Sequence, residues 1–467
     1  MVALGSLSTV FLMLSDYIRG SIRKDERIVF FPTIATQELS MQPSRVGILG
    51  DSSVNGGVYG GVPNMTTTTT NNNNNTTTTT VWQVPIHGWV FQPNRHEKRR
   101  KLFLTLLRRY LNISNANYQN DVLKRRMAPF LVDNSRNKLV RVRFDGDNND
   151  EIHTLPRSSK NGHFYGVVRV NTTTTNNNTT DDEHQAAAAS SPPTLLKFQA
   201  VLHKKGDTRI FGSQAHLVPS QGISIISDID DTVKITNVTS RKSMLRNTFL
   251  EEFQPVPGMA QVFRDWQQRM SCQFHFVSSS PWQLYEDLDA FCQKQDFPDA
   301  TFHLKSIRVK DRTLFQLFAN PMATKTKVIT NILEQFPERT FICVGDSGEK
   351  DPEVYGALAR QYPNQIAYIL IRDIIGTRKQ QPTMTTTTRS STSSTDVPSM
   401  SSSTATSSID DGDDELDGNN DDPDEESEED RMERAFARVP RDKWAVFTDA
   451  SEIELPLRLL EKTRGRP

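Results

Sequence analysis

Two aspartates, Asp228 and Asp230, stand two residues apart directly after the apolar run 223–227. A short apolar run of this kind is typical of a buried parallel strand. Residues two apart in an extended backbone project to the same side, so the two carboxylates can hold one Mg²⁺ and leave an oxygen to attack phosphorus. This spacing indicates phosphoryl transfer through an aspartyl-phosphate, in which the metal offsets the repulsion between carboxylate and phosphate.

Two groups that suit the phosphate follow downstream. Ser278 is the first residue after a second apolar run, 274–277, where a hydroxyl or a backbone N–H can hold a phosphate oxygen, and the two serines after it are alternatives. Lys325 begins a run whose apolar residues have helical spacing. An ammonium group there can neutralise the charge that builds on a transferred phosphoryl group, although Lys327 is an alternative for this role.

A third apolar run, 340–344, leads into a glycine turn and an acidic loop that would bring Asp346 and Asp351 to the metal. Taken alone, each feature has an ordinary structural explanation. For example, Asp351 before Pro352 fits the start of a helix. Four such elements in order, each at a strand end or a helix start, favour catalysis over coincidence.

The order and wording of these motifs resemble the haloacid-dehalogenase-like phosphohydrolases. They are more similar still to the Mg²⁺-dependent phosphatidate phosphatase domain of the fungal actin-patch-associated phosphatases, with lipins as more distant relatives. The resemblance is strong over 218–375 and weaker over 25–45 and 80–218. The segments that carry it are SDIDDTVK, FVSSSPWQL, FHLKSIRV, FICVGDSGEKDPEVY and YILIRDI.

The resemblance implies roles for individual residues. Asp228 would be the nucleophile, and Asp230 the general acid for the departing diacylglycerol hydroxyl and then the base for water. Phosphate would be held by Thr232, Ser278 and Lys325, and Mg²⁺ by Asp228, Asp230, Asp346 and Asp351, the last through water or by orienting Lys325.

The expected fold of the catalytic part is α/β, a doubly wound parallel sheet of the haloacid-dehalogenase-like kind with a small or absent cap. Open sheets of this class bind ligands outside the carboxyl ends of their strands, where the candidate residues stand. About forty residues separate Thr232 from the next strand, and they include a predicted helix at 259–270. That is too little chain for a large lid, and an open site suits a phosphate on a lipid or a macromolecule.

Changes in composition divide the chain. Threonine, asparagine and serine tracts bury too little apolar surface to offset ordering entropy, which predicts disorder. Short β-type runs bounded by turn residues indicate an antiparallel sandwich, interrupted by a helical stretch around 97–127. The expected segments are a partly ordered one at 1–63, a linker at 64–80, a mainly-β accessory domain at 81–220 with a disordered insert at 171–193, the catalytic domain at 221–376, a disordered linker at 377–432 and a docking segment at 433–467.

The net charge of −1 conceals an asymmetry. Residues 410–430 hold 14 acidic and no basic side chains, so removing them leaves a body of about +13. A basic body suits a membrane surface that contains phosphatidate, and no motif accompanies it that would indicate nucleic acid. Two basic and apolar stretches, 98–109 and 305–318, are candidates for contact with an anionic bilayer, with ordinary surface helices or a charged strand edge as the alternatives.

The three cysteines, at 272, 292 and 343, lack metal-binding spacing and fit reduced structural thiols. No apolar run is long enough to span a bilayer. Together with what the resemblance implies, these features lead us to expect a cytoplasmic protein, peripheral to membranes or at actin patches, that hydrolyses phosphatidate to diacylglycerol and phosphate. The alternatives are another lipid or protein phosphate monoester, a non-catalytic phosphatidate-binding module, and a scaffold for actin-patch or endocytic proteins.

Overall fold

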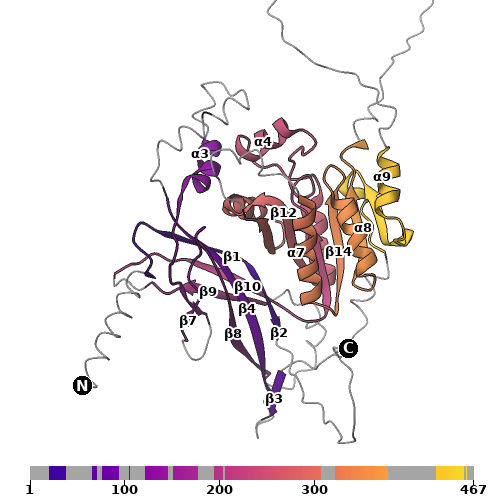
Figure 1. Ribbon diagram of the computed structural model, residues 1–467. Helices are drawn as coiled ribbons and strands as arrows, with labels where there is room; N and C mark the ends of the chain where they lie inside the picture. Colours follow the sequence, from indigo (N-terminus) through magenta and orange to yellow (C-terminus); the bar gives the residue numbers. More distant parts are fainter. Residues whose placement is uncertain are drawn as a thin grey trace, which may run out of the picture.

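The computed structural model describes two sheets and the helices around them (Figure 1). It describes residues 20–37, 66–70, 76–93, 105, 121–145, 151–176, 194–202, 206–306, 321–376, 427–456 and 459. Among these residues, no helix combines the length and apolar character that crossing a bilayer requires. The basic stretch at 98–109, apart from Thr105, and residues 307–318 of the second stretch lie outside the described residues.

The catalytic sheet has six strands, and every pairing in it is parallel. In spatial order they are β13 (Ala300–Lys305), β12 (Gln273–Pro281), β11 (Gly222–Ser227), β14 (Arg339–Asp346), β15 (Ile366–Arg372) and β16 (Trp444–Phe447). The three strands expected at 223–227, 274–277 and 340–344 are all present. The strand order reverses between β11 and β14, and open α/β sheets bind ligands at such a point.

Successive side chains of these strands enter two different hydrophobic cores. Ile225 belongs to one core and Ile226 to the other, because neighbouring residues of a strand point to opposite faces. The first core is covered by α4 (Arg241–Phe249), α5 (Met259–Met270) and α6 (Tyr285–Lys294), and the second by α7 (Pro321–Gln335), α8 (Asp351–Gln361) and α9 (Glu428–Ala435). The prediction of a parallel α/β fold is confirmed, and the helix predicted at 259–270 is α5.

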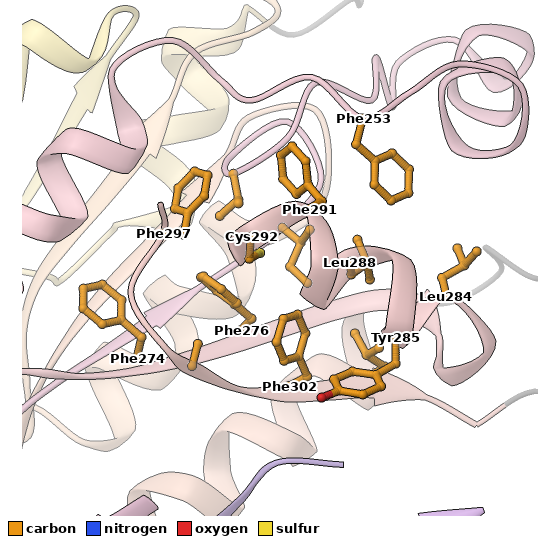
Figure 2. Packing of buried hydrophobic residues seen from close by; sticks show 14 of the residues in the cluster. Phe253, Phe274, Phe276, Leu284, Tyr285, Leu288, Phe291, Cys292, Phe297 and Phe302 are labelled. Carbon is orange, nitrogen blue, oxygen red and sulfur yellow. The ribbon is translucent and has the colours of Figure 1, made fainter. Parts of the chain in front are cut away.

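The first core is rich in aromatic side chains. Figure 2 shows Phe276 and Phe302 of neighbouring strands below α6, which contributes Leu288, Phe291 and Cys292. The rings of Phe276 and Phe302 meet edge to face, with centroids 5.4 Å apart. Such packing holds β12 and β13 together, and therefore keeps the residues at the carboxyl end of β12 in fixed positions.

The amino-terminal part forms a sheet of ten strands around its own core. The strands are β1 (Arg27–Phe31), β2 (Thr33–Gln37), β3 (Thr66–Thr70), β4 (Thr76–Gln92), β5 (Asp133–Asn134), β6 (Arg141–Phe144), β7 (His153–Thr154), β8 (His163–Asn176), β9 (Thr194–Ala200) and β10 (Gly212–Val218). Its pairings are antiparallel except for β10 with β2. Three of its strands, β1, β2 and β3, come from before the boundary predicted at residue 81, and β4 crosses it.

The threonine tracts differ from expectation. Composition predicts disorder there, but the structure places 66–70, 76–80 and 172–176 in strands β3, β4 and β8. The ladder between β4 and β8 runs without interruption from Trp89↔His163 to Thr76↔Asn176. Threonine is β-branched and favours extended backbone, so a strand that is already paired can continue through a tract that would not order alone.

The carboxy-terminal segment lies against the catalytic sheet. Residues Ile369–Arg372 of β15 pair with Trp444–Phe447 of β16, which is the edge strand of the sheet. Helix α9 begins at Glu428, inside the linker predicted to be disordered to 432. The helix has a local reason to start there, since the Ser427 side chain accepts a hydrogen bond from the backbone N–H of Asp430 and acidic side chains fill its first turn.

The two sheets are joined by contacts between buried side chains. Phe31 of β1 packs on Trp282, with ring centroids 4.1 Å apart. Arg126 of α3 (Asp121–Met127), the described part of the stretch expected to be helical at 97–127, is 1% exposed. Its guanidinium donates to the carbonyl of Thr248 at 2.7 Å and lies 3.5 Å from the centre of the Phe253 ring.

Candidate active site

Asp228 lies directly after β11 and is fully buried. Its backbone N–H donates to the carbonyl of Val344 at 2.9 Å, which fixes it against the neighbouring strand β14. The carboxylate oxygen Oδ1 accepts a hydrogen bond from Lys325 Nζ at 2.7 Å. Among the described residues, the other oxygen, Oδ2, has no partner. Since a buried polar atom without a partner is costly, Oδ2 is the atom that a ligand would engage.

Asp230 is held on both of its oxygens. Oδ1 accepts from Lys234 Nζ at 2.6 Å and from the Thr236 hydroxyl at 2.8 Å. Oδ2 accepts from the hydroxyl of Ser278 at 2.9 Å and from that of Ser280 at 3.1 Å. The orientation of this carboxylate is therefore fixed from four sides.

The turn that follows is shaped by Asp231. Its φ of 54° lies in the left-handed region, where Asp is among the non-glycine residues found most often. Its carboxylate accepts from the backbone N–H groups of Thr236, Asn237 and Val238 at 2.7–2.9 Å. Thr232 is fully buried, and its hydroxyl is without a partner among the described residues. The turn thus leaves the Thr232 hydroxyl available beside the two aspartates.

Lys325 reaches the site from α7. It is buried, and Nζ forms ion pairs with Asp228 at 2.7 Å and with Asp351, while Glu349 lies 3.9 Å away. Lys327 is exposed on the same helix. Of these two lysines, Lys325 is the one that the structure brings to the acidic residues.

The loop after β14 supplies further carboxylates. Asp346 Oδ1 accepts from the backbone N–H of Gly348 at 2.7 Å and of Glu349 at 3.0 Å, and Asp346 Oδ2 has no partner in the described part of the chain. A Cβ atom at Gly345 would collide with Asp351. The glycine before Asp346 is required because the Asp351 carboxylate packs directly against its backbone.

Three carboxylates in this region can hold a cation. One oxygen from each of Asp228, Glu349 and Asp351 lies within 4.8 Å of the other two. Hard divalent cations prefer oxygen ligands of this kind, and the unpartnered oxygen of Asp346 also fits such an ion. Asp230 and Asp346, expected to bind metal, are not members of this group of three, and Glu349 joins it without having been predicted.

The electrostatics of the site also favour a bound cation. Burial raises the pKa of the Asp228 and Asp346 carboxyls well above the ordinary value, and Lys325 offsets this only in part. Burial likewise raises the pKa of Glu349 to about 7. These shifts indicate that one lysine does not balance the buried negative charge, so a bound cation would favour the ionised carboxylates.

Asp230 behaves in the opposite way. Burial alone would raise its pKa, but the Lys234 ammonium and the surrounding hydroxyl donors outweigh burial and lower it. Asp230 is thus held as a carboxylate. For Lys325, burial acts against the ammonium form, yet the charges of Asp228 and Asp351 raise its pKa well above the ordinary value.

Several functional contacts were not predicted from the sequence. Lys234, Thr236 and Ser280 bind Asp230, and Glu349 joins the acidic group. The only signal available for Lys234 was its position six residues after Asp228, and for Glu349 its place in the acidic loop between Asp346 and Asp351.

The comparisons with known proteins bear on this same region. Residues 223–373 match the family described as "Phosphatidate phosphatase APP1, catalytic domain". The resemblance predicted from the motifs is confirmed over these residues. Phosphatidate phosphatase APP1 of Saccharomyces cerevisiae is 38% identical over 161 residues, which is 34% of this chain and 27% of the yeast protein.

A second relative, an uncharacterized protein of Schizosaccharomyces pombe, is 31% identical over 184 residues, which is 38% of this chain and 30% of that protein. The chain thus spans less than a third of the length of these two curated relatives. A solved structure of a carbohydrate esterase aligns at 11% identity over 66% of this chain and 85% of that chain, with a TM-score of 0.17. An alignment that poor carries no argument about fold.

Proposed function

We propose that this chain is a Mg²⁺-dependent phosphatidate phosphatase that hydrolyses phosphatidate to diacylglycerol and phosphate. One observation carries the proposal: Asp228 Oδ2 is buried and unpartnered in the described structure while Oδ1 is held by Lys325. This is the arrangement that a nucleophilic carboxylate needs, because one oxygen is fixed and the other is available. The name of the yeast relative, phosphatidate phosphatase, supports the choice of substrate.

The fold that we propose is haloacid-dehalogenase-like with a small or absent cap. In the described chain between Asp231 and β12 the helices are α4 and α5, and between β12 and α7 the structure describes α6 and β13. None of these four elements forms a separate lid domain. An open site of this kind would accept a phosphate at the surface of a bilayer, in keeping with a peripheral membrane location.

In the first step, Asp228 Oδ2 attacks phosphorus as the bond from phosphorus to the diacylglycerol oxygen breaks. When bound at Asp228, Glu349 and Asp351, with Asp346 beside them, Mg²⁺ would neutralise phosphate charge and orient the phosphoryl group. Lys325 Nζ is placed to stabilise the transferring oxygens. The hydroxyls of Thr232 and Ser278 are the further donors proposed for phosphate.

Asp230 acts first as the general acid for the departing oxygen and then as the general base for water. Its Oδ1 is hydrogen-bonded to the Lys234 ammonium at 2.6 Å, so the Asp230 carboxylate passes a proton from Lys234 to the leaving diacylglycerol oxygen and itself remains ionised. In the second step, Asp230 takes a proton from water as the water oxygen attacks the aspartyl-phosphate. Phosphate leaves, the Asp228 carboxylate is restored, and the proton returns to Lys234.

The deciding experiment measures phosphate release from phosphatidate in mixed micelles and from a soluble phosphate monoester, with Mg²⁺ present or chelated. We expect Mg²⁺-dependent release from the lipid and its loss in Asp228→Asn. Asp289→Asn, a half-buried aspartate of α6 outside the site, is the matched control and should retain activity.

Each of the other possible outcomes would contradict a different part of the proposal. Equal rates for Asp228→Asn and the parent would overturn the nucleophile. Cleavage of the soluble ester alone would remove the lipid from the proposal. Binding of phosphatidate vesicles without any release of phosphate would instead favour a lipid-binding module or a scaffold for actin-patch proteins.

A further inference from the structure

Helix α9 sends one side chain onto the acidic loop of the active site. The guanidinium of Arg431 donates to the carbonyl of Ser347 from Nη1 and to that of Glu349 from Nη2, both at 2.6 Å. It also forms a paired contact with Glu353 of α8, at 3.0 Å from Nε and 2.9 Å from Nη2. The side chain is 14% exposed. Arg431 therefore joins α9, the acidic loop and the first turn of α8.

The same loop uses its other backbone groups to hold Asp346. While the carbonyls of Ser347 and Glu349 accept from Arg431, the N–H groups of Gly348 and Glu349 donate to Asp346 Oδ1. The carbonyl of Ser347 and the N–H of Gly348 belong to one planar peptide group, so the bond from Arg431 to that carbonyl also sets the direction of the Gly348 N–H. Arg431 thereby directs one of the two donors to Asp346 Oδ1 and, through the Glu349 carbonyl, holds the residue that supplies the other.

The helix that carries Arg431 is itself firmly anchored. Met432 and Ala435 are buried in the core beneath α8. Arg360 of α8 donates to the carbonyl of Ala435 at 2.9 Å. Gly356 of α8 lies so close to that carbonyl that a Cβ atom there would collide with it. Arg431 thus projects from a helix, α9, that is held in a fixed position against α8.

We propose that Arg431 is a positioning residue for the metal-binding loop, supplied by a segment outside the region that matches the catalytic domain. The matched region ends at residue 373, and the contact from Arg431 to Ser347 spans 84 residues. The loop that carries Asp346, Glu349 and Asp351 is therefore completed by the carboxy-terminal segment. Only the expected effect on kcat rests on the proposed function; the expected effects on Mg²⁺ affinity and on the loop do not.

The test uses the full chain and compares Arg431→Gln, Arg431→Lys and the control Arg434→Gln. Arg434 is exposed on the same helix, so its loss changes the charge of α9 by the same amount. The readouts are Mg²⁺ affinity by calorimetry without substrate, hydrogen exchange of the Gly348 and Glu349 amides, and kcat and KM for phosphatidate. The first two do not depend on the protein being a phosphatase.

We expect Arg431→Gln to lower Mg²⁺ affinity by about 10- to 100-fold, the usual effect of removing a group that orients metal ligands. The two amides should exchange faster, kcat should fall at saturating lipid while KM changes little, and Arg434→Gln should match the parent. Arg431→Lys keeps the charge but cannot reach both carbonyls in one plane, so it should lose about 10-fold in affinity. If Arg431→Gln does not fold, Arg431→Lys carries the comparison.

The proposal is overturned if the folded variants bind Mg²⁺ as tightly as the parent and exchange both amides at the parent's rate. It is also overturned if Arg434→Gln weakens Mg²⁺ binding equally, because the effect would then come from the charge of α9. Reduced Mg²⁺ affinity in a protein that releases no phosphate would support the role of Arg431 and remove the phosphatase proposal alone.

Discussion

Lys325 Nζ donates to Asp228 Oδ1 at 2.7 Å and at the same time contacts Asp351. One ammonium thus joins the strand end that carries the proposed nucleophile to the helix start that carries a proposed metal ligand. All three side chains are buried, with Lys325 at 4% exposure and both aspartates at 0%. This contact is why the site holds together although its carboxylates come from distant parts of the chain.

Replacing Lys325 by Met is expected to lower kcat for phosphatidate by about 10²- to 10³-fold, because a preorganised charge at the transferring phosphate is lost. Mg²⁺ should stabilise this variant against heat more than it stabilises the parent, since nothing else offsets the buried carboxylates. Phosphate release and thermal unfolding with and without Mg²⁺ measure both effects. Lys327→Met, on the exposed face of α7, is the control and should keep parental kcat; a similar loss there would refute the assignment.

Lys234→Met tests the second buried lysine. Lys234 lowers the pKa of Asp230 against the effect of burial, so its removal should raise that pKa. The acidic limb of the pH profile of kcat/KM should then move to higher pH, and kcat should fall by about 10²-fold because the proton source is gone. The exposed Lys242 of α4 provides the control Lys242→Met. An unchanged acidic limb in Lys234→Met would contradict the role of this pair.

The strand ends of the site could be predicted because local patterns determine them. An apolar run followed by Asp228, or by Gly345 and Asp346, contains both the strand and the point at which it stops. Lys325 could be predicted for the same reason, since helical spacing starts at it. The contact between Lys234 and Asp230 could not, because it depends on the left-handed φ of Asp231, which turns the chain back on itself.

Longer-range features were beyond local patterns. Arg431 reaches Ser347 across 84 residues, and no motif around it indicates that partner. The prediction of disorder for the threonine tracts differed from the structure for a similar reason. Composition describes a segment by itself, whereas in β4 and β8 these tracts extend a ladder that is already paired. In both cases the local structure depends on which strand or helix packs alongside the segment. A single sequence does not reveal these neighbours.

Gly356→Ala tests the close approach of α8 and α9. In an exposed helix this change would stabilise by about 1 kcal/mol, but here the new methyl group would collide with the carbonyl of Ala435. We expect a net loss of about 1–3 kcal/mol in the free energy of unfolding, as for other overpacked sites. Urea denaturation measures it, with the exposed Gln361→Ala on the same helix as control. Stabilisation by Gly356→Ala would show that the two helices are not held this closely.

A pair of partly buried histidines allows us to predict how stability depends on pH. His87 Nε2 and His163 Nδ1 lie 3.0 Å apart beside Phe31 and Trp282, where the two sheets meet. Burial, with the repulsion of neighbouring histidines, lowers the pKa of His87 to about 3, and burial lowers the pKa of His163 to about 4. Both rings are therefore neutral in the folded protein at pH values where they are protonated in the unfolded chain.

The sign follows from these values. A folded pKa below the unfolded value of about 6.5 gives stability that is fully present above pH 6.5 and is lost as the pH falls. Between about pH 6 and pH 4.5, each histidine should lower the free energy of unfolding by up to about 1.4 kcal/mol per pH unit. Urea denaturation across this range should therefore give a slope that is shallower by about that amount in His87→Gln than in the parent. His153→Gln, at the edge strand β7, is the control, and equal slopes for His87→Gln and the parent would show that His87 is not held neutral between the sheets.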